Sequence, residues 1–246
     1  MQDTAPIAII GLGLIGTALS ERLINAGVPL IGFDVDPARC ERLEANGGLV
    51  AASVRELANQ SRVVIVAVYS GTQADALLDD IEDGAGGLPT TIICATTCAP
   101  HEIARLSERT VNAGIALIEA PVSGTSAELR DGSALMLLGA EPALIASLGT
   151  LLDILCPRRV RAGNVGDASR TKLAINLVLQ ANRAALAEGI AFAEALGLDG
   201  PTFLATARAS AAYSRVMKAL VAMLSPISAV ASPAASRMSR LSAVIA

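Results

Sequence analysis

Lys172 and Asn176 stand four positions apart in the stretch GNVGDASRTKLAIN (163–176), where an apolar helix is predicted to begin. Positions i and i+4 of a helix share one face, so the lysine amine and the asparagine amide would point into the same space. Apolar neighbours that partly desolvate a lysine lower its pKa toward neutrality, where the amine can exchange a proton with a hydroxyl group. The alternative is a surface lysine whose stem packs on the helix while its ammonium group reaches water.

The other residue types that commonly carry chemistry are scarce. His101 is the only histidine, and the four cysteines, Cys40, Cys94, Cys98 and Cys156, form no CxxC pair. We therefore expect neither a metal site nor a Ser-His-Asp triad. Buried free thiols in a reducing cytoplasm are the better interpretation of the cysteines, so we expect a cytoplasmic protein.

A glycine pattern near the start of the chain has the spacing of a phosphate-binding turn. The run IAII (7–10) predicts a buried strand, GLGLIG follows it with Gly11, Gly13 and Gly16, and residues 17–27 predict an amphipathic helix. Gly11 would allow the tight turn, Gly13 the approach of the backbone to a pyrophosphate, and Gly16 the close packing of helix on strand. The helix N-terminus would offer free N–H groups to the phosphates.

Asp34 ends the next predicted strand, PLIGFD, where it could accept hydrogen bonds from the hydroxyls of an adenine ribose. A carboxylate there would repel a 2′-phosphate, and the next residue is Val35 rather than an arginine that could hold one. NAD is therefore the preferred cofactor. Arg39, in the following helix, could reach such a phosphate, which leaves NADP open.

Strand and helix patterns continue to alternate along the chain. Apolar strands are predicted at 62–68, 90–97 and 115–122, with helices at 72–81 and 100–114. This alternation predicts a doubly wound, mostly parallel sheet, whose ligands lie beyond the carboxyl ends of the strands. The residues predicted to bind the dinucleotide are Gly11, Leu12, Gly13, Leu14, Ile15, Gly16, Asp34, Val68, Tyr69 and Thr97.

Two domains are expected from this pattern. Residues 1–162 would form an α/β domain of the Rossmann type, and residues 163–246 an all-α domain that appears shortened and starts with a long helix over about 168–198. The helix is apolar on more than one face, which fits core packing, a subunit interface or both. We expect a homodimer formed through the helical domain.

Two stretches resemble the signatures of a known family, the β-hydroxyacid dehydrogenases. These include 3-hydroxyisobutyrate dehydrogenase, tartronate semialdehyde reductase and relatives of 6-phosphogluconate dehydrogenase. EAPVSGTSAELRDG (119–132) is similar to the family's substrate signature D-A-P-V-S-G-G, from which Glu119 and Thr125 depart. The catalytic signature is a glycine pair followed by K-x-x-x-N. The residues that match it are Gly163, Gly166, Lys172 and Asn176.

The resemblance implies an oxidoreductase that transfers a hydride between NAD(P) and a small 3-hydroxy acid or its semialdehyde. It implies that Lys172 is the general acid/base, that Asn176 positions the substrate and that Thr97 lies near the nicotinamide. It also implies that Ser123 and Gly124 hold the substrate, and we place Thr125 with them. A hydroxyl and backbone N–H groups can bind a small carboxylate without bulk.

The chain departs from the family past about Val216. Family members continue with several more helices and a K-D-L-like segment, whereas this tail has no acidic residue after Asp199, and Pro226 and Pro233 interrupt any helix. One alternative is therefore a dinucleotide-binding protein whose atypical C-terminus impairs or abolishes turnover. Another is an imine-reductase-like enzyme, although those enzymes usually replace the lysine at this position.

The composition excludes several classes of partner. A formal net charge of −4 gives no electrostatic attraction to nucleic acid, and an aromatic content of 2% without tryptophan provides no base-stacking platform. The start of the chain lacks the basic region of a signal peptide, and no apolar run approaches the roughly 20 residues of a membrane span. We expect a small hydroxy acid as the partner, and neither nucleic acid nor membrane.

Overall fold

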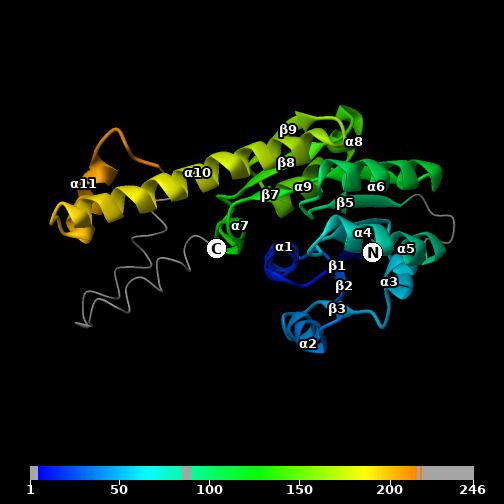
Figure 1. Ribbon diagram of the computed structural model, residues 1–246. Helices are drawn as coiled ribbons and strands as arrows, with labels where there is room; N and C mark the ends of the chain where they lie inside the picture. The colour runs from blue at the N-terminus through cyan, green and yellow to red at the C-terminus, as the bar shows by residue number, and fades with distance from the viewer. Residues whose placement is uncertain (1–4, 85–89, 215–216, 218–246) are drawn as a thin grey trace. The chain divides into compact units, whose positions relative to one another are not determined.

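The computed structural model describes residues 5–84, 90–214 and 217 (Figure 1). The chain divides into two compact units, Met1–Lys172 and Leu173–Ala246. The domain boundary after residue 162 stays a prediction from the sequence. Apart from Met217, the atypical tail lies outside the described residues.

The first unit is built on one sheet whose described strands follow the order β3-β2-β1-β4-β5-β6-β8-β7, with β9 paired to β8. Neighbouring strands from β3 to β6 are parallel, as are β8 and β9, whereas β8 runs antiparallel to β6 and β7. The predicted mostly parallel sheet is confirmed. The strands are β1 (Ile7–Ile10), β2 (Leu30–Phe33), β3 (Leu49–Val50), β4 (Val63–Val66), β5 (Thr91–Cys94), β6 (Ala116–Glu119), β7 (Val122–Ser123), β8 (Leu135–Gly139) and β9 (Arg159–Gly163).

Helices cover both faces of this sheet (Figure 1). Apart from α7, which lies between the antiparallel strands β7 and β8, they connect the parallel strands, as expected for a doubly wound fold. The helices of the first unit are α1 (Leu14–Asn25), α2 (Pro37–Ala45), α3 (Val54–Gln60), α4 (Gly71–Ala76), α5 (Leu78–Gly84), α6 (Pro100–Asn112), α7 (Ser126–Arg130), α8 (Pro142–Ser147) and α9 (Gly149–Leu155).

Successive residues of the central strands face two separate hydrophobic clusters. Ile9 of β1 and Ile65 of β4 pack in one cluster, together with residues of α1, α2, α7 and α9. Ile10 and Val64 pack in the other cluster, together with residues of α3, α5 and α6. Because both faces of the sheet are buried, these strands read as continuous apolar runs rather than as alternating patterns.

The single helix predicted over 72–81 is wrong. Two helices occupy this stretch, α4 and α5, and Leu77 separates them. The Arg109 guanidinium of α6 donates a hydrogen bond of 2.7 Å to the backbone carbonyl of Asp75, an oxygen that a continuous helix would have used internally. The tertiary contact explains the break.

The single strand predicted over 115–122 is also divided. Its first part is β6, which ends at Glu119, and its last residue, Val122, begins β7. Pro121 lies between them and has no N–H group to donate to a neighbouring strand. The chain therefore leaves the parallel arrangement at this point, and β7 pairs antiparallel with β8.

Helix α10 (Asp167–Ala195) begins in the first unit and continues into the second. It starts one residue before the predicted position and ends three residues early, and Gly197, with φ of 78°, follows its end. Lys172 thus lies in the second turn and not at the helix start. The second unit also contains α11 (Gly200–Ala209), and its core consists of Leu186, Ile190, Leu204, Ala207 and Met217.

Candidate functional site

The glycine loop between β1 and α1 has the geometry that a pyrophosphate requires. Gly11 has φ of 91°, and a side chain there would place its Cβ 2.5 Å from the Ala67 carbonyl oxygen. A Cβ at Gly16 would overlap the backbone of Gly11, so this glycine allows helix and loop to pack closely. Gly13 differs, because a Cβ there would meet only the Arg39 guanidinium, at 3.9 Å. Its free space faces outward, where a ligand can approach the backbone.

The start of α1 fits an anionic group as well. Gly13 is the N-cap, no side chain caps the helix and no acidic residue occupies its first turn. Its N–H groups and the positive end of the helix dipole therefore remain for phosphate oxygens. Among the predicted loop residues, Leu12 is buried and Leu14 is exposed, with Ile15 between these extremes. The loop fits the diphosphate of a dinucleotide.

Asp34 follows β2 directly and lies beside the glycine loop. Its carboxylate accepts hydrogen bonds from the Leu12 N–H at 2.6 Å and the Asp36 N–H at 2.9 Å, and it pairs with the Arg39 guanidinium at 3.2 Å. Burial alone would raise the pKa of Asp34, but the N–H donors of Asp36 and Leu12 together with Arg39 outweigh it, and the pKa lies below its ordinary value. The residue is an anion placed next to the loop, as a ribose-binding acid must be.

The loops after β4 and β5 contribute the remaining predicted cofactor residues. Tyr69 is 94% exposed, Val68 is half-buried and Thr97 is exposed. Thr96 is buried, and its hydroxyl bonds to both the N–H and the carbonyl of Val68, each at 3.1 Å. Thr96 thus ties the two loops together, and the side chains of Tyr69 and Thr97 stay accessible beyond the carboxyl ends of the strands.

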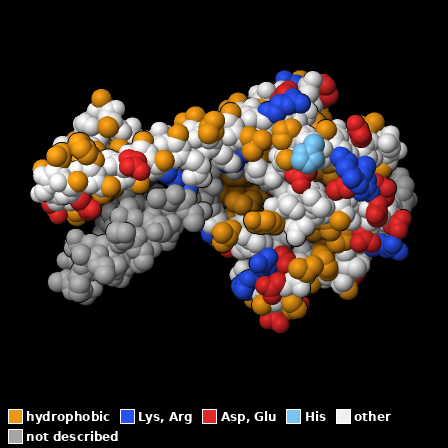
Figure 2. All heavy atoms as spheres, viewed as in Figure 1, with side chains coloured by type: hydrophobic (Ala, Val, Ile, Leu, Met, Phe, Trp, Pro, Cys, Tyr) orange, Lys and Arg blue, Asp and Glu red, His pale blue; other side chains and the backbone are white. Residues whose placement is uncertain are grey.

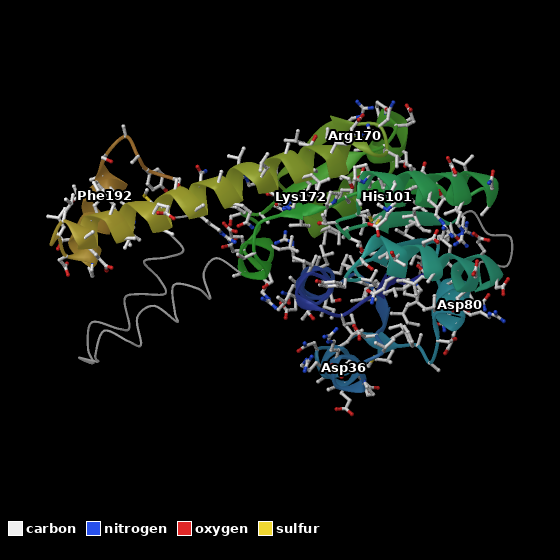
Figure 3. All side chains as sticks on the ribbon, viewed as in Figure 1. Asp36, Asp80, His101, Arg170, Lys172 and Phe192 are labelled. Atoms are coloured by element: carbon white, nitrogen blue, oxygen red, sulfur yellow. The ribbon has the colours of Figure 1, made fainter. Side chains whose placement is uncertain are left out.

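Lys172 is 8% exposed, and burial lowers the pKa of its amine. Among the residues that the structure describes, no carboxylate or other group bonds to this amine. The neighbouring Arg170 differs, since it is exposed and pairs with Asp167 at 2.8 Å (Figure 3). Helix α10 therefore keeps a desolvated amine on its buried side and a solvated guanidinium on its outer side.

Glu119 positions the start of α10. It is the last residue of β6, it is fully buried, and its carboxylate accepts N–H bonds from Gly166, Ala168 and Ser169 at 2.7, 3.2 and 2.7 Å. The sequence prediction treated this residue only as a departure from a signature. A glutamate inside the apolar run IALIEAPV was the available signal, because a carboxylate in a buried strand must find donors.

The predicted substrate residues lie between β7 and α7. Ser123 is half-buried in β7, and Gly124 is exposed with φ of 147°. Thr125 is the N-cap of α7, where its hydroxyl accepts the Glu128 N–H at 3.1 Å and the Glu128 carboxylate accepts the Thr125 N–H at 2.9 Å. The structure thus gives Thr125 a capping role in the helix that follows.

Asn176 and His101 complete the candidates. Asn176 is half-buried in α10, one turn after Lys172, and belongs to the second unit. His101 is the second residue of α6, and its imidazole lies on the surface (Figure 2). Within the described ranges, no group of three or more metal-binding side chains occurs and no helix is long and apolar enough to cross a membrane.

Comparison with known protein families agrees with this geometry. Residues 6–166 match the model of the NAD-binding domain of 6-phosphogluconate dehydrogenase, and residues 166–230 match that of the NAD-binding domain of NADP-dependent 3-hydroxyisobutyrate dehydrogenase. The sheet, the glycine loop and these matches define a dinucleotide-binding protein with NAD or NADP as its cofactor. The chain belongs to the β-hydroxyacid dehydrogenase family.

Curated relatives carry related names. Mouse mitochondrial 3-hydroxyisobutyrate dehydrogenase is 29% identical over 214 residues, which are 83% of this chain and 62% of the mouse protein. L-threonate dehydrogenase of Haemophilus influenzae is 28% identical over 78% of this chain and 65% of its own length. The chain therefore spans a little over six tenths of the length of these relatives.

Solved structures share the fold. A Mycobacterium tuberculosis 3-hydroxyisobutyrate dehydrogenase with L-serine superposes with a TM-score of 0.77 at 24% identity, over 85% of this chain and 72% of that one. An imine reductase variant from Myxococcus stipitatus in complex with NAD⁺ gives a TM-score of 0.78 at 20% identity, over 94% of this chain and 80% of the other. At these identities the likeness shows the fold alone.

Proposed function

We propose that the protein is an oxidoreductase that transfers a hydride between NAD(P) and a small 3-hydroxy acid or its semialdehyde, with Lys172 as the general acid/base. The observation that carries the proposal is the environment of Lys172. A buried amine with a lowered pKa and no described partner is adapted to proton exchange rather than to an ion pair.

The rest of the basic residues strengthen this argument. The chain contains two lysines, Lys172 and Lys218, and apart from His101 all its other basic residues are arginines. A guanidinium stays protonated in proteins, so an arginine at position 172 would supply charge but could not accept a proton. Lysine at the buried position on α10 therefore provides a chemistry that the common basic residue of this chain cannot.

In the proposed reaction, the neutral amine of Lys172 accepts the proton of the substrate hydroxyl during oxidation and returns it during reduction. NAD(P), when bound, accepts or supplies the hydride. The glycine loop would hold the diphosphate, and Asp34, which lies beside that loop, would accept hydrogen bonds from the ribose. Asn176 is proposed to position the substrate, and Ser123, Gly124 and Thr125 to bind its carboxylate.

The proposed substrate class follows from what the relatives' names share. They include dehydrogenases of 3-hydroxyisobutyrate, L-threonate and 2-(hydroxymethyl)glutarate and a reductase of glyoxylate and succinic semialdehyde. Each compound is a small carboxylic acid with a hydroxyl or an aldehyde group. A panel of such acids, followed by the absorbance of NADH and NADPH, identifies the preferred member.

The proposal extends to assembly and location. Helix α10 leaves Leu177, Val178 and Phe192 exposed, which supports a homodimer formed through the helical unit. Sedimentation equilibrium at several concentrations tests this, and a monomer at all of them would contradict it. The free thiols of Cys40, Cys94, Cys98 and Cys156 support a location in the reducing cytoplasm.

The central test compares wild type with Lys172→Ala and Lys172→Arg. The NADH dissociation constant should stay within about twofold, because Lys172 is outside the glycine loop, whereas kcat should fall by roughly 10²-fold or more, the usual contribution of a positioned acid/base. Arg170→Ala is the matched control, since Arg170 is an exposed basic residue of the same helix, two positions before Lys172. If Lys172→Arg retained most of the activity, charge and not proton transfer would be the role of Lys172.

A further inference from the structure

Three backbone N–H groups at the start of α10 share one acceptor from another part of the chain. Oε2 of Glu119 accepts the N–H groups of Gly166 and Ala168, and Oε1 accepts that of Ser169. The first N–H groups of a helix have no partner within the helix, and they lie at its positive end. A buried carboxylate that accepts three of them fixes where the helix begins.

The carboxylate has little freedom to move. Glu119 pairs with Gly139 of the antiparallel strand β8, and a Cβ at Gly139 would lie 2.5 Å from Oε2 of Glu119 and 2.8 Å from the carbonyl oxygen of Asn164. The absence of a side chain at Gly139 thus leaves space for the carboxylate, and the pairing of Glu119 with Gly139 fixes its backbone in the sheet. The start of α10 is fixed to the carboxyl end of β6 through this side chain.

The same contacts determine where Lys172 lies. Ala168 and Ser169 precede Lys172 by four and three residues, which is one helical turn. The amine itself has no hydrogen-bond or ion-pair partner among the described residues, so no direct contact of that kind orients it. Its place relative to the sheet follows from the helix backbone, and Glu119 sets that backbone.

We propose that Glu119 is the positioning residue for Lys172, acting through the first turn of α10. This inference rests on the proposed function of Lys172 as acid/base. A carboxylate suits the task because both of its oxygens accept hydrogen bonds. The amide of glutamine would turn an NH₂ group toward backbone N–H donors and would lose at least one of the three bonds.

The experiment compares wild type with Glu119→Gln, Glu119→Asp and the control Glu141→Gln, a glutamate exposed at the start of α8. We expect Glu119→Gln to bind NADH within about twofold of wild type and to lose up to about 10²-fold in kcat, the scale of a misplacement near 1 Å. Glu119→Asp keeps the charge and should recover part of kcat. Glu141→Gln should match wild type.

A second measurement does not depend on turnover. The pH dependence of reductive methylation of Lys172, read by mass spectrometry with Lys218 as the internal reference, gives the pKa of the Lys172 amine. We expect this pKa to rise toward that of an ordinary lysine in Glu119→Gln, because a displaced first turn admits water. Loss of a neighbouring negative charge alone would lower it, so the direction separates positioning from a charge effect.

The outcomes distinguish the two proposals. An unchanged or lowered Lys172 pKa together with wild-type kcat in Glu119→Gln would overturn the positioning role. If Glu119→Gln fails to fold, Glu119→Asp is measured in its place, because it retains the carboxylate on a shorter side chain. An unchanged or lowered Lys172 pKa together with wild-type kcat in Glu119→Asp would then overturn the positioning role. A raised Lys172 pKa in Glu119→Gln, combined with full activity of Lys172→Arg, would keep the positioning role and overturn the acid/base role.

Discussion

Asp34 and Glu119 show how a strand-end carboxylate can be used in two ways. Each is buried or nearly so and accepts at least one backbone N–H group from a segment that is distant in sequence. Asp34 uses two N–H donors and the Arg39 guanidinium, and a carboxylate has about four acceptor sites, so capacity remains for a ribose hydroxyl. Glu119 lies close to Gly139 of β8, and its carboxylate accepts the N–H groups of Gly166, Ala168 and Ser169 at the start of α10.

The pair of Asp34 and Arg39 leads to a prediction about the cofactor. NAD(H) should bind more tightly than NADP(H) in calorimetry, because the carboxylate of Asp34, with 4% of its side chain exposed, is proposed to lie where a 2′-phosphate would bind and would repel it. Asp34→Ala should weaken NAD(H) binding by roughly 1–3 kcal/mol, the scale of a hydrogen bond to a charged group. The same substitution should also release Arg39 from its ion pair and reduce the difference in affinity between NAD(H) and NADP(H).

Arg39→Ala tests the other half of the pair. Arg39 is half-exposed and would be the cation nearest a 2′-phosphate, so its loss should weaken NADP(H) more than NAD(H). Asp153→Ala is the control, because Asp153 is an exposed residue of α9 that pairs with Arg159 of β9. Equal or tighter binding of NADP(H) by the wild type would contradict the assignment of Asp34.

The lowered pKa of Lys172 gives a pH dependence with a definite sign. In the proposed reaction, oxidation needs the neutral amine, so kcat/KM for oxidation should rise with pH and level off above the pKa of Lys172 in the folded protein. This pKa lies below the value of about 10.4 for an ordinary lysine. Reduction in the proposed reaction needs the protonated amine, so kcat/KM for reduction should fall over the same pH range. A pH profile in each direction measures this, and a Lys172→Ala profile without the rise is the expected counterpart.

In the glycine loop, Gly16 is expected to matter for stability and Gly13 for cofactor binding. Gly16→Ala should lower the free energy of unfolding by more than 1 kcal/mol, because its Cβ would overlap the Gly11 backbone. Gly13→Ala should leave the free energy of unfolding nearly unchanged, since only Arg39 comes within 4 Å, yet it should weaken NADH binding. Urea unfolding with NADH titration measures both. Equal stability of the two variants would show that the loop geometry is misassigned.

The same elements show what the sequence could predict. The glycine loop, Asp34 and the parallel strands follow from short-range patterns, since each glycine answers a local steric demand. The contact of Glu119 with Gly166 joins residues 47 positions apart and depends on the antiparallel pairing of Glu119 with Gly139, which no local period reveals. The break between α4 and α5 likewise depends on Arg109, a distant residue.

At the scale of the whole molecule, the described residues form two hydrophobic clusters in the sheet unit and a separate one in the second unit. The glycine loop belongs to the unit Met1–Lys172. NADH at about 100 times its dissociation constant should therefore stabilise that unit by about 2.7 kcal/mol. Calorimetry with and without NADH measures the shift, and Gly13→Ala should reduce it. No shift in the wild type would contradict binding at this loop.

The exposed ring of Tyr69 has an optical consequence. The chain contains no tryptophan and two tyrosines, Tyr69 beyond β4 and Tyr213 in the second unit, so each unit carries one tyrosine fluorophore. Ultraviolet emission from this protein is free of the tryptophan signal that usually masks tyrosine. Emission that is lost in Tyr69→Phe and retained in Tyr213→Phe therefore reports on the edge of the sheet where the dinucleotide is expected, without any attached dye.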